Sequence, residues 1–440
     1  MRRSLAAQFL VLAPLAAQPS TPSFAGYWEG AIQIPGSEMK IQVTLEGNGA
    51  VWSGRISIPP QGAKDLALGD VKVAGDAVSF AMPGIPGEPK FSGKLGKAGR
   101  IEGMFSQGGQ VFPFVLARAG AAAPVAASAS KPDPQDRELG FPGFNAFPLK
   151  GSVRAGGAHP YFAVMVAGSG PTDRDWSNPL ISVPSHGGRD FAAWLQGRGL
   201  GSLRYDKRFV GSRDAKLDIS LDAQLGDIKA ALKAAQLLPE AKGKKLLLVG
   251  HSEGSLLSLL AAGEADAALL LAMPGISMGK LILLQVQGQL QAAAAPEAVS
   301  KPNLAYLDAA LNAIRKDQEL PPPGVDVVAG IANLAKGLTR PESRGFIRAT
   351  MDLDPWAMAQ RLPVPCAIVW GDRDIQTWKP AAVPPEFKGV VLQIPEANHL
   401  LKRETRPLAE LSGPTAVSTY GDTTPLADLA PLAAWLKALK

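Results

Sequence analysis

The sequence predicts a doubly wound, mostly parallel α/β sheet with a helical cap, preceded by a small all-β domain, and three observations support this. Short runs with period-two alternation, broken by Gly, Pro and Asn, fill residues 24–118. From residue 137 to residue 440, apolar runs alternate with helical segments, as in a sheet covered by helices. The interval from about 278 to 361 has no strand pattern and is rich in Ala, Leu and Gln, which indicates a helical cap.

The first of these regions is expected to be an antiparallel sandwich or a small barrel. Its clearest alternating runs lie at residues 39–45, 51–56 and 111–116. The region contains no histidine and no cluster of polar side chains, so a packing or spacer role is favoured over binding of a ligand or sugar. Residues 119–136 hold few large apolar side chains and are predicted to be a linker.

The amino terminus has the pattern of a secretory signal. Two arginines follow Met1, an apolar stretch runs from Leu5 to Leu15, and small residues come next, so residues 1–18 are predicted to be a cleaved signal peptide. The apolar stretch is about half the ~20 residues that span a bilayer, and no membrane span is expected. We therefore expect export to the periplasm or the medium; the alternative is a frayed terminus of a cytosolic protein.

Composition narrows the kinds of chemistry open to the chain. The 45 basic and 39 acidic residues of this 440-residue chain give a net charge of +6 without a basic run, which does not indicate nucleic-acid binding. A single cysteine, Cys366, excludes an intramolecular disulfide and a cysteine-based zinc site. Four histidines provide few ligands for any other kind of metal site, so neither a metal nor a cofactor is expected.

A candidate nucleophile, Ser252, lies in Gly250-His251-Ser252-Glu253-Gly254, directly after an apolar strand and before a helical segment. This is the context of a nucleophile elbow, a strained turn whose flanking glycines allow close backbone approach. The residues around Ser277 also match Gly-x-Ser-x-Gly, but Met273-Pro274 separates that copy from its strand. We therefore expect Ser252 to be the nucleophile and Ser277 to be a loop serine at the entrance of the cap.

A serine nucleophile on such a turn needs an imidazole base. In proteins with this elbow, the three catalytic residues follow one another along the chain in the order Ser, acid, His. His399 is the one histidine of the four that follows Ser252, in a loop after the last apolar strand. Asp374 is the expected acid because it ends the strand-Gly-x-x-Asp pattern; Asp372 and, more distantly, Glu396 are the alternatives. The backbone N–H groups of Glu253 and Ser169 are expected to form the oxyanion hole. The Gly-rich loop of Ser169 lacks the patterns of a phosphate cradle.

With these motifs in order, residues 137–440 resemble the α/β-hydrolase superfamily, and in particular bacterial serine esterases. The matching segments are Gly-Ser-Gly-Pro-Thr-Asp-Arg-Asp at 168–175, Arg-Tyr-Asp-Lys-Arg at 204–208 and the Gly-His-Ser-Glu-Gly motif. The resemblance implies a Ser252, Asp374 and His399 triad and a carboxylesterase for short to medium acyl chains. Trp176 and Phe209 depart from the pattern, where a small residue and a glycine are more usual. The β-rich region resembles accessory domains fused to such esterases.

Other functions are compatible with the same motifs. A serine aminopeptidase, amidase or thioesterase would use the same triad, and a peptidase would need a carboxylate near the substrate amine. A non-catalytic binding protein is disfavoured because it has no need of nucleophile, base, acid and donor loop together. The sequence does not indicate the oligomeric state.

The candidate amine-binding carboxylates in the cap are Glu297, Asp308, Glu319 and Asp326. The aliphatic side chains expected to line an acyl pocket are Leu281, Ile282, Leu283, Leu284 and Ile331. The charged side chains expected to brace the loops are Asp173, Arg174, Asp206 and Arg208.

Overall fold

The structure is a computed structural model that divides into two compact units, Met1–Ala122 and Ala123–Lys440. The predicted signal peptide and residues 119–132 of the predicted linker lie outside the described residues. The described residues are 24–34, 37–48, 51–59, 63–83, 89–96, 99–107, 110–118, 133–178, 185–210, 217–292, 295–380, 382–411 and 417–439.

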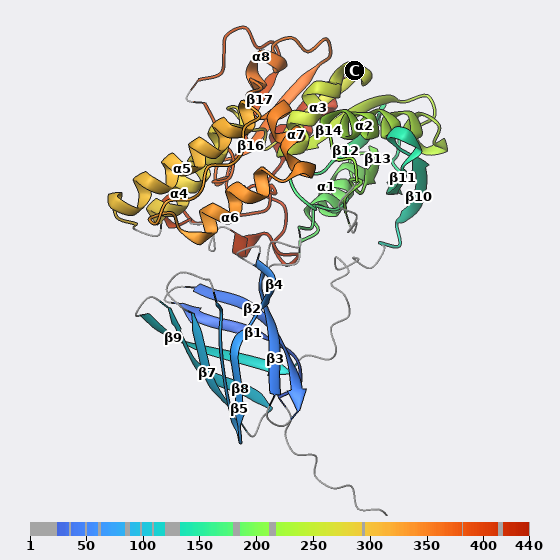
Figure 1. Cartoon of the computed structure of the whole chain (residues 1–440). Coiled ribbons are helices and arrows are strands. Elements are labelled where there is room, and N and C mark those ends of the chain that lie inside the picture. The colour runs from blue at the N-terminus through green and yellow to red at the C-terminus, as the bar shows by residue number, and fades with distance from the viewer. Residues whose placement is uncertain are drawn as a thin grey trace, which may run out of the picture. The chain divides into compact units, whose positions relative to one another are not determined.

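The N-terminal unit contains one antiparallel sheet in the order β4-β3-β2-β1-β9-β8-β7-β6-β5 (Figure 1). The strands are β1 (Gly26–Ile34), β2 (Ser37–Asn48), β3 (Val51–Ile58), β4 (Ala63–Ala67), β5 (Gly69–Ala74), β6 (Ala77–Ala81), β7 (Lys90–Leu95), β8 (Arg100–Gln107) and β9 (Gln110–Arg118). The sheet curls so that β5 contacts β3. Alternate residues are buried in one core, which contains Trp28 and the packed rings of Phe91 and Phe114. The all-β prediction is confirmed, with a single curled sheet.

The C-terminal unit is built on an eight-stranded sheet in the order β10-β11-β13-β12-β14-β15-β16-β17. The strands are β10 (Asp136–Pro142), β11 (Pro148–Arg154), β12 (Tyr161–Val166), β13 (Gly201–Tyr205), β14 (Lys245–His251), β15 (Ala267–Leu271), β16 (Cys366–Gly371) and β17 (Val390–Ile394). β10, β11 and β13 pair antiparallel, and all pairs from β13 to β17 are parallel. The prediction of a mostly parallel sheet is therefore confirmed.

Helices cover both faces of this sheet because its inner strands are apolar on both sides. In β12, Tyr161 belongs to a core with α1 (Gly187–Gln196) and α10 (Ala430–Ala438), whereas Phe162 belongs to the opposite core with α2 (Leu221–Gln236). Such continuous apolar runs are typical of parallel strands buried on two faces. The carboxyl ends of the parallel strands meet at one edge, where the loops that carry chemistry lie in such sheets.

Between β15 and β16, the described residues of the predicted cap form four helices and a short fifth. They are α4 (Met278–Ala292), α5 (Glu297–Arg315), α6 (Ala329–Leu338), α7 (Pro341–Thr350) and α8 (Pro355–Ala359). The aliphatic side chains expected to line an acyl pocket mostly pack within the cap itself: Ile282, Leu283 and Ile331 join its small cores, and Leu284 is 41% exposed. No helix of the described residues is long and apolar enough to cross a membrane.

Candidate active site

Ser252 occupies a strained turn between β14 and α3 (Glu253–Ala261), as the elbow motif predicts. Its φ is +55°, a left-handed conformation that is unfavourable for a residue with a side chain. A Cβ on Gly250 would lie 2.4 Å from the Gly254 carbonyl oxygen, and one on Gly254 would lie 2.5 Å from that of Val166. Both glycines are therefore required by close backbone approach, and the turn presents Ser252 at the end of the strand.

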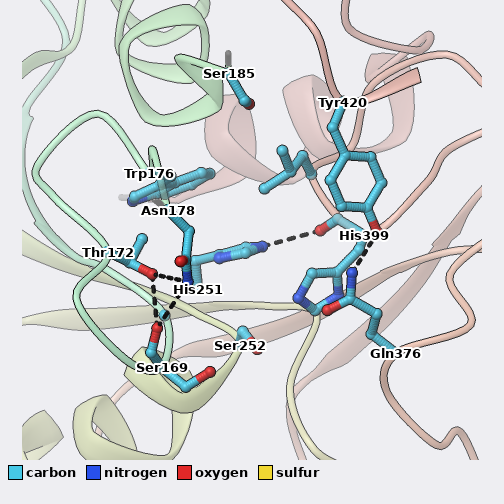
Figure 2. A pocket seen from close by; sticks show the side chains of 12 residues that line it. Ser169, Thr172, Trp176, Asn178, Ser185, His251, Ser252, Gln376, His399 and Tyr420 are labelled. Carbon is cyan, nitrogen blue, oxygen red and sulfur yellow. Dashed lines mark hydrogen bonds between the residues drawn. The ribbon is translucent and has the colours of Figure 1, made fainter. Parts of the chain in front are cut away.

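The structure brings Ser252, His399 and Asp374 to the same edge of the sheet. Asp374 follows β16 and His399 follows β17, and the His399 Nδ1 atom lies 3.0 Å from Asp374 Oδ2. Ser252 and His399 line one cavity, where Figure 2 shows them on neighbouring walls. The described residues show no hydrogen bond between the serine hydroxyl and the imidazole; such contacts are often long before a substrate binds.

Asp374 is fully buried and held as a carboxylate by hydrogen bonds. Oδ2 also accepts from the Thr377 hydroxyl at 2.6 Å, and Oδ1 accepts from the Gln376 N–H at 2.8 Å. Burial alone would raise the pKa of Asp374, but His399 and these donors outweigh it and lower the pKa to about 2. Asp372 instead contacts Arg373, and Glu396 pairs with Arg403, so neither alternative acid faces the imidazole.

His251, the residue before the nucleophile, has a role that the sequence did not indicate. Its Nε2–H donates to the His399 backbone carbonyl at 2.9 Å, and its ring stacks on Trp176 with centroids 4.5 Å apart (Figure 2). The imidazole is buried, and its Nδ1 has no partner among the described residues. His251 therefore connects the elbow to the loop of the base, and Trp176, one of the departures from the esterase pattern, forms the wall behind it.

His251 should make the folded protein sensitive to acid. Burial, with His399 nearby, lowers its pKa from 6.5 to about 3. Between these values the unfolded chain binds a proton that the folded chain does not, so stability falls as pH drops, by at most about 1.4 kcal/mol per pH unit. We expect His251→Gln to flatten the dependence of the free energy of unfolding on pH between 6.5 and 4, measured by denaturant titration. Parallel curves for the two proteins would contradict this assignment.

The predicted oxyanion donors flank the nucleophile. A Cβ on Gly168 would lie 3.2 Å from the Ser252 Cβ, so the loop that carries Ser169 passes directly beside the serine. The Ser169 carbonyl accepts from the Thr172 hydroxyl at 2.6 Å, which fixes the loop. Glu253 begins α3, and the first N–H groups of a helix have no partner within it. Both residues predicted to donate thus lie beside Ser252.

The charged side chains around these loops form ion pairs. Arg174 binds Asp206 through both its backbone N–H and its guanidinium, and Arg208 binds Asp227. Asp173 accepts from the N–H groups of Asp175 and Ser177 and so closes the turn after the oxyanion loop. Burial raises the pKa of Asp173 to about 6. These contacts match the bracing network expected from the sequence.

The cavity beside Ser252 has a volume of about 60 Å³ and no acidic side chain among its described lining. It is lined by Gly168, Ser169, Thr172, Trp176, Asn178, Ser185, His251, Ser252, Gln376, His399, Leu400 and Tyr420. No cap residue is among them. All four cap carboxylates considered for amine binding are exposed instead. No group of three His, Cys, Asp or Glu side chains in the described ranges could hold a metal ion.

Ser277, the alternative nucleophile, lies elsewhere in the fold. It directly precedes α4, where its carbonyl accepts the Leu281 N–H. Gly275 of the same motif packs against the Trp378 carbonyl. This segment therefore does not form a turn that leads directly from a strand into a helix. Ser277 does not line the cavity of Ser252 and His399. The second Gly-x-Ser-x-Gly match therefore has the sequence of an elbow without its geometry.

Comparison with known proteins gives a family and distant relatives. The model described as "Alpha/beta hydrolase family" matches residues 163–412, more than half of the chain. Esterase EstD of Thermotoga maritima is 26% identical over 249 residues, which are 56% of this chain and 54% of that protein. The chain thus spans about half the length of this curated relative.

Solved structures with a similar fold include an esterase of Pyrococcus furiosus and the alpha/beta hydrolase GrgF of a Penicillium species. The first is 16% identical with a TM-score of 0.39, and covers 60% of this chain and 82% of its own. The second is 18% identical with a TM-score of 0.37, and covers 60% and 91% respectively. Both are too distant from the chain to indicate its substrate.

Proposed function

The chain belongs to the alpha/beta hydrolase family, and from this premise we propose that it is a hydrolase, and more narrowly a serine carboxylesterase. The observation that carries the proposal is one cavity lined both by a strained serine and by a histidine whose Nδ1 lies 3.0 Å from a carboxylate. A buried Asp374 carboxylate that binds Nδ1 leaves Nε2 as the proton acceptor. This is the arrangement that activates a serine hydroxyl.

In the proposed reaction, the Ser252 oxygen attacks the ester carbonyl while His399 Nε2 takes the hydroxyl proton. The carbonyl oxygen becomes an oxyanion, which accepts from the N–H groups of Ser169 and Glu253. His399 then returns the proton to the leaving alcohol as the ester bond breaks. Water, deprotonated by the same imidazole, attacks the carbonyl carbon of the acyl-Ser252 ester, and the imidazole gives this proton to the Ser252 oxygen as the C–O bond breaks and the acid leaves.

The described cavity favours esters over peptides and short acyl groups over long ones. Its lining carries no carboxylate for a substrate amine, and the cap carboxylates that a peptidase would need are exposed. The cavity is partly open to solvent and has a volume of about 60 Å³, which has room for a short acyl group while the alcohol part of the ester lies outside it. Ester cleavage with a short acyl preference is therefore the proposal; a thioester, which would use the same machinery, is the second candidate.

A substrate series tests this proposal. We expect hydrolysis of p-nitrophenyl acetate and butyrate, with kcat/KM falling steeply by octanoate and laurate because the small cavity excludes long chains. Aminoacyl p-nitroanilides should react far more slowly. Preference for the anilides would replace the esterase proposal by the peptidase, and a maximum at laurate would show that the acyl group binds outside the described cavity.

A further inference from the structure

Lys207 is a buried lysine that the proposed reaction does not use. It follows β13 within the Arg-Tyr-Asp-Lys-Arg segment, and its side chain is 5% exposed. Its Nζ donates to the Gly168 carbonyl and lies 3.6 Å from Glu253 Oε1. It lies against Phe209, with Nζ 4.9 Å from the ring centre. One amino group thus contacts both segments that supply the predicted oxyanion donors.

The contact with Gly168 determines where the neighbouring N–H points. The carbonyl of Gly168 and the N–H of Ser169 belong to the same peptide group, which is planar and trans, so they point in opposite directions. Lys207 binds the carbonyl and does not line the cavity of Ser252. The Ser169 N–H is therefore aimed away from Lys207. A hydrogen bond to the carbonyl also polarises the amide and strengthens its N–H as a donor.

The contact with Glu253 restrains the second donor. Glu253 is buried at the start of α3, next to Ser252, and its carboxylate faces Lys207. Without a nearby cation, a buried carboxylate would have to reorient toward water or another donor, which would disturb the first turn of the helix. The backbone N–H of that turn is the one that the proposed oxyanion accepts.

We propose that Lys207 is a positioning residue that sets the oxyanion hole by holding the Gly168–Ser169 peptide and the Glu253 side chain from behind. The inference rests on the proposed function and deepens it. It assigns the lysine of the Arg-Tyr-Asp-Lys-Arg segment to transition-state binding, distinct from its flanking residues Asp206 and Arg208, which pair with Arg174 and Asp227.

Two variants separate positioning from charge neutralisation. Lys207→Met keeps the unbranched side chain up to the position of Cε but removes the amino group, so Gly168 loses its donor and Glu253 is left unpaired. The double variant Lys207→Met with Glu253→Gln also removes the unpaired charge, so it should recover folding stability. Lys229→Met is the matched control, because Lys229 forms an exposed ion pair with Glu264. The readouts are thermal stability, kcat and KM for p-nitrophenyl acetate, and inhibition by an aryl trifluoromethyl ketone, whose adduct with serine carries an oxyanion.

We expect both Lys207 variants to lose about 100-fold in kcat with little change in KM, the size of effect seen when one oxyanion donor is lost. Affinity for the ketone should fall in parallel, and Lys229→Met should match the wild type. Full recovery of kcat in the double variant, or unchanged kcat in Lys207→Met, would overturn the inference while ester hydrolysis by the wild type stands. If Lys207→Met does not fold, the double variant carries the same test. A wild type inert toward ester and ketone would overturn the proposed function and this inference together.

Discussion

Ser252→Ala is expected to lower kcat for p-nitrophenyl acetate by about 10⁵-fold or more, as for removal of a nucleophile in other serine hydrolases. The variant loses the one hydroxyl that lies on the strained turn and shares a cavity with His399. Folding should be retained, because alanine has the same backbone preferences as serine at this φ and the Ser252 side chain makes no capping hydrogen bond to α3. Steady-state kinetics with a circular dichroism spectrum checks both expectations.

Ser277→Ala is the matched control for this prediction. It makes the same chemical change in the other Gly-x-Ser-x-Gly segment, whose serine precedes α4 and does not line the cavity. Its kcat and KM should equal those of the wild type. Turnover retained in Ser252→Ala but lost in Ser277→Ala would contradict the assignment of the nucleophile.

Asp374→Asn is expected to lower kcat by about 10⁴-fold, the loss measured when the acid of such a triad becomes an amide. The carboxylate binds His399 Nδ1 and accepts from Thr377 and Gln376. An amide at this position can turn its NH₂ toward Nδ1, which would favour the tautomer with the proton on Nε2 and block proton transfer from Ser252. Kinetics at pH 7 to 9 measures the effect.

Asp372→Asn is the control for the acid. Asp372 lies two residues earlier in the same loop and contacts Arg373, not the imidazole. It should retain most of the wild-type kcat. A larger loss in Asp372→Asn than in Asp374→Asn would show that the loop rearranges when substrate binds and would refute the choice of Asp374.

The elements predicted from the sequence are those whose causes are local. Period-two alternation revealed the N-terminal sheet, and continuous apolar runs revealed the parallel strands. The elbow was recognisable because glycine is needed on both sides of Ser252. Strand order then explains why loops distant in sequence meet: parallel strands β14, β16 and β17 bring their carboxyl ends to one edge. Export remains a prediction, since residues 1–18 lie outside the described residues.

What the sequence did not reveal depends on contacts between segments far apart in the chain. His251 occupies a variable position of the Gly-x-Ser-x-Gly motif, yet it binds the carbonyl of His399, 148 positions away. Lys207 lies between two residues of the predicted bracing network, and the signal for its role in the sequence is a lysine two residues after an apolar strand. The cap aliphatic residues were assigned to an acyl pocket because composition alone does not distinguish a cavity lining from the cap's own core.

The most direct test of the central claim is to map where an activated phosphonate binds. A p-nitrophenyl alkylphosphonate should transfer its phosphonyl group to the nucleophilic oxygen and release p-nitrophenolate. Intact and peptide mass spectrometry should then find one adduct per chain, located on Ser252, that develops as ester hydrolysis is lost. An adduct on Ser277 or another residue, or full ester turnover with Ser252 unmodified, would contradict the account.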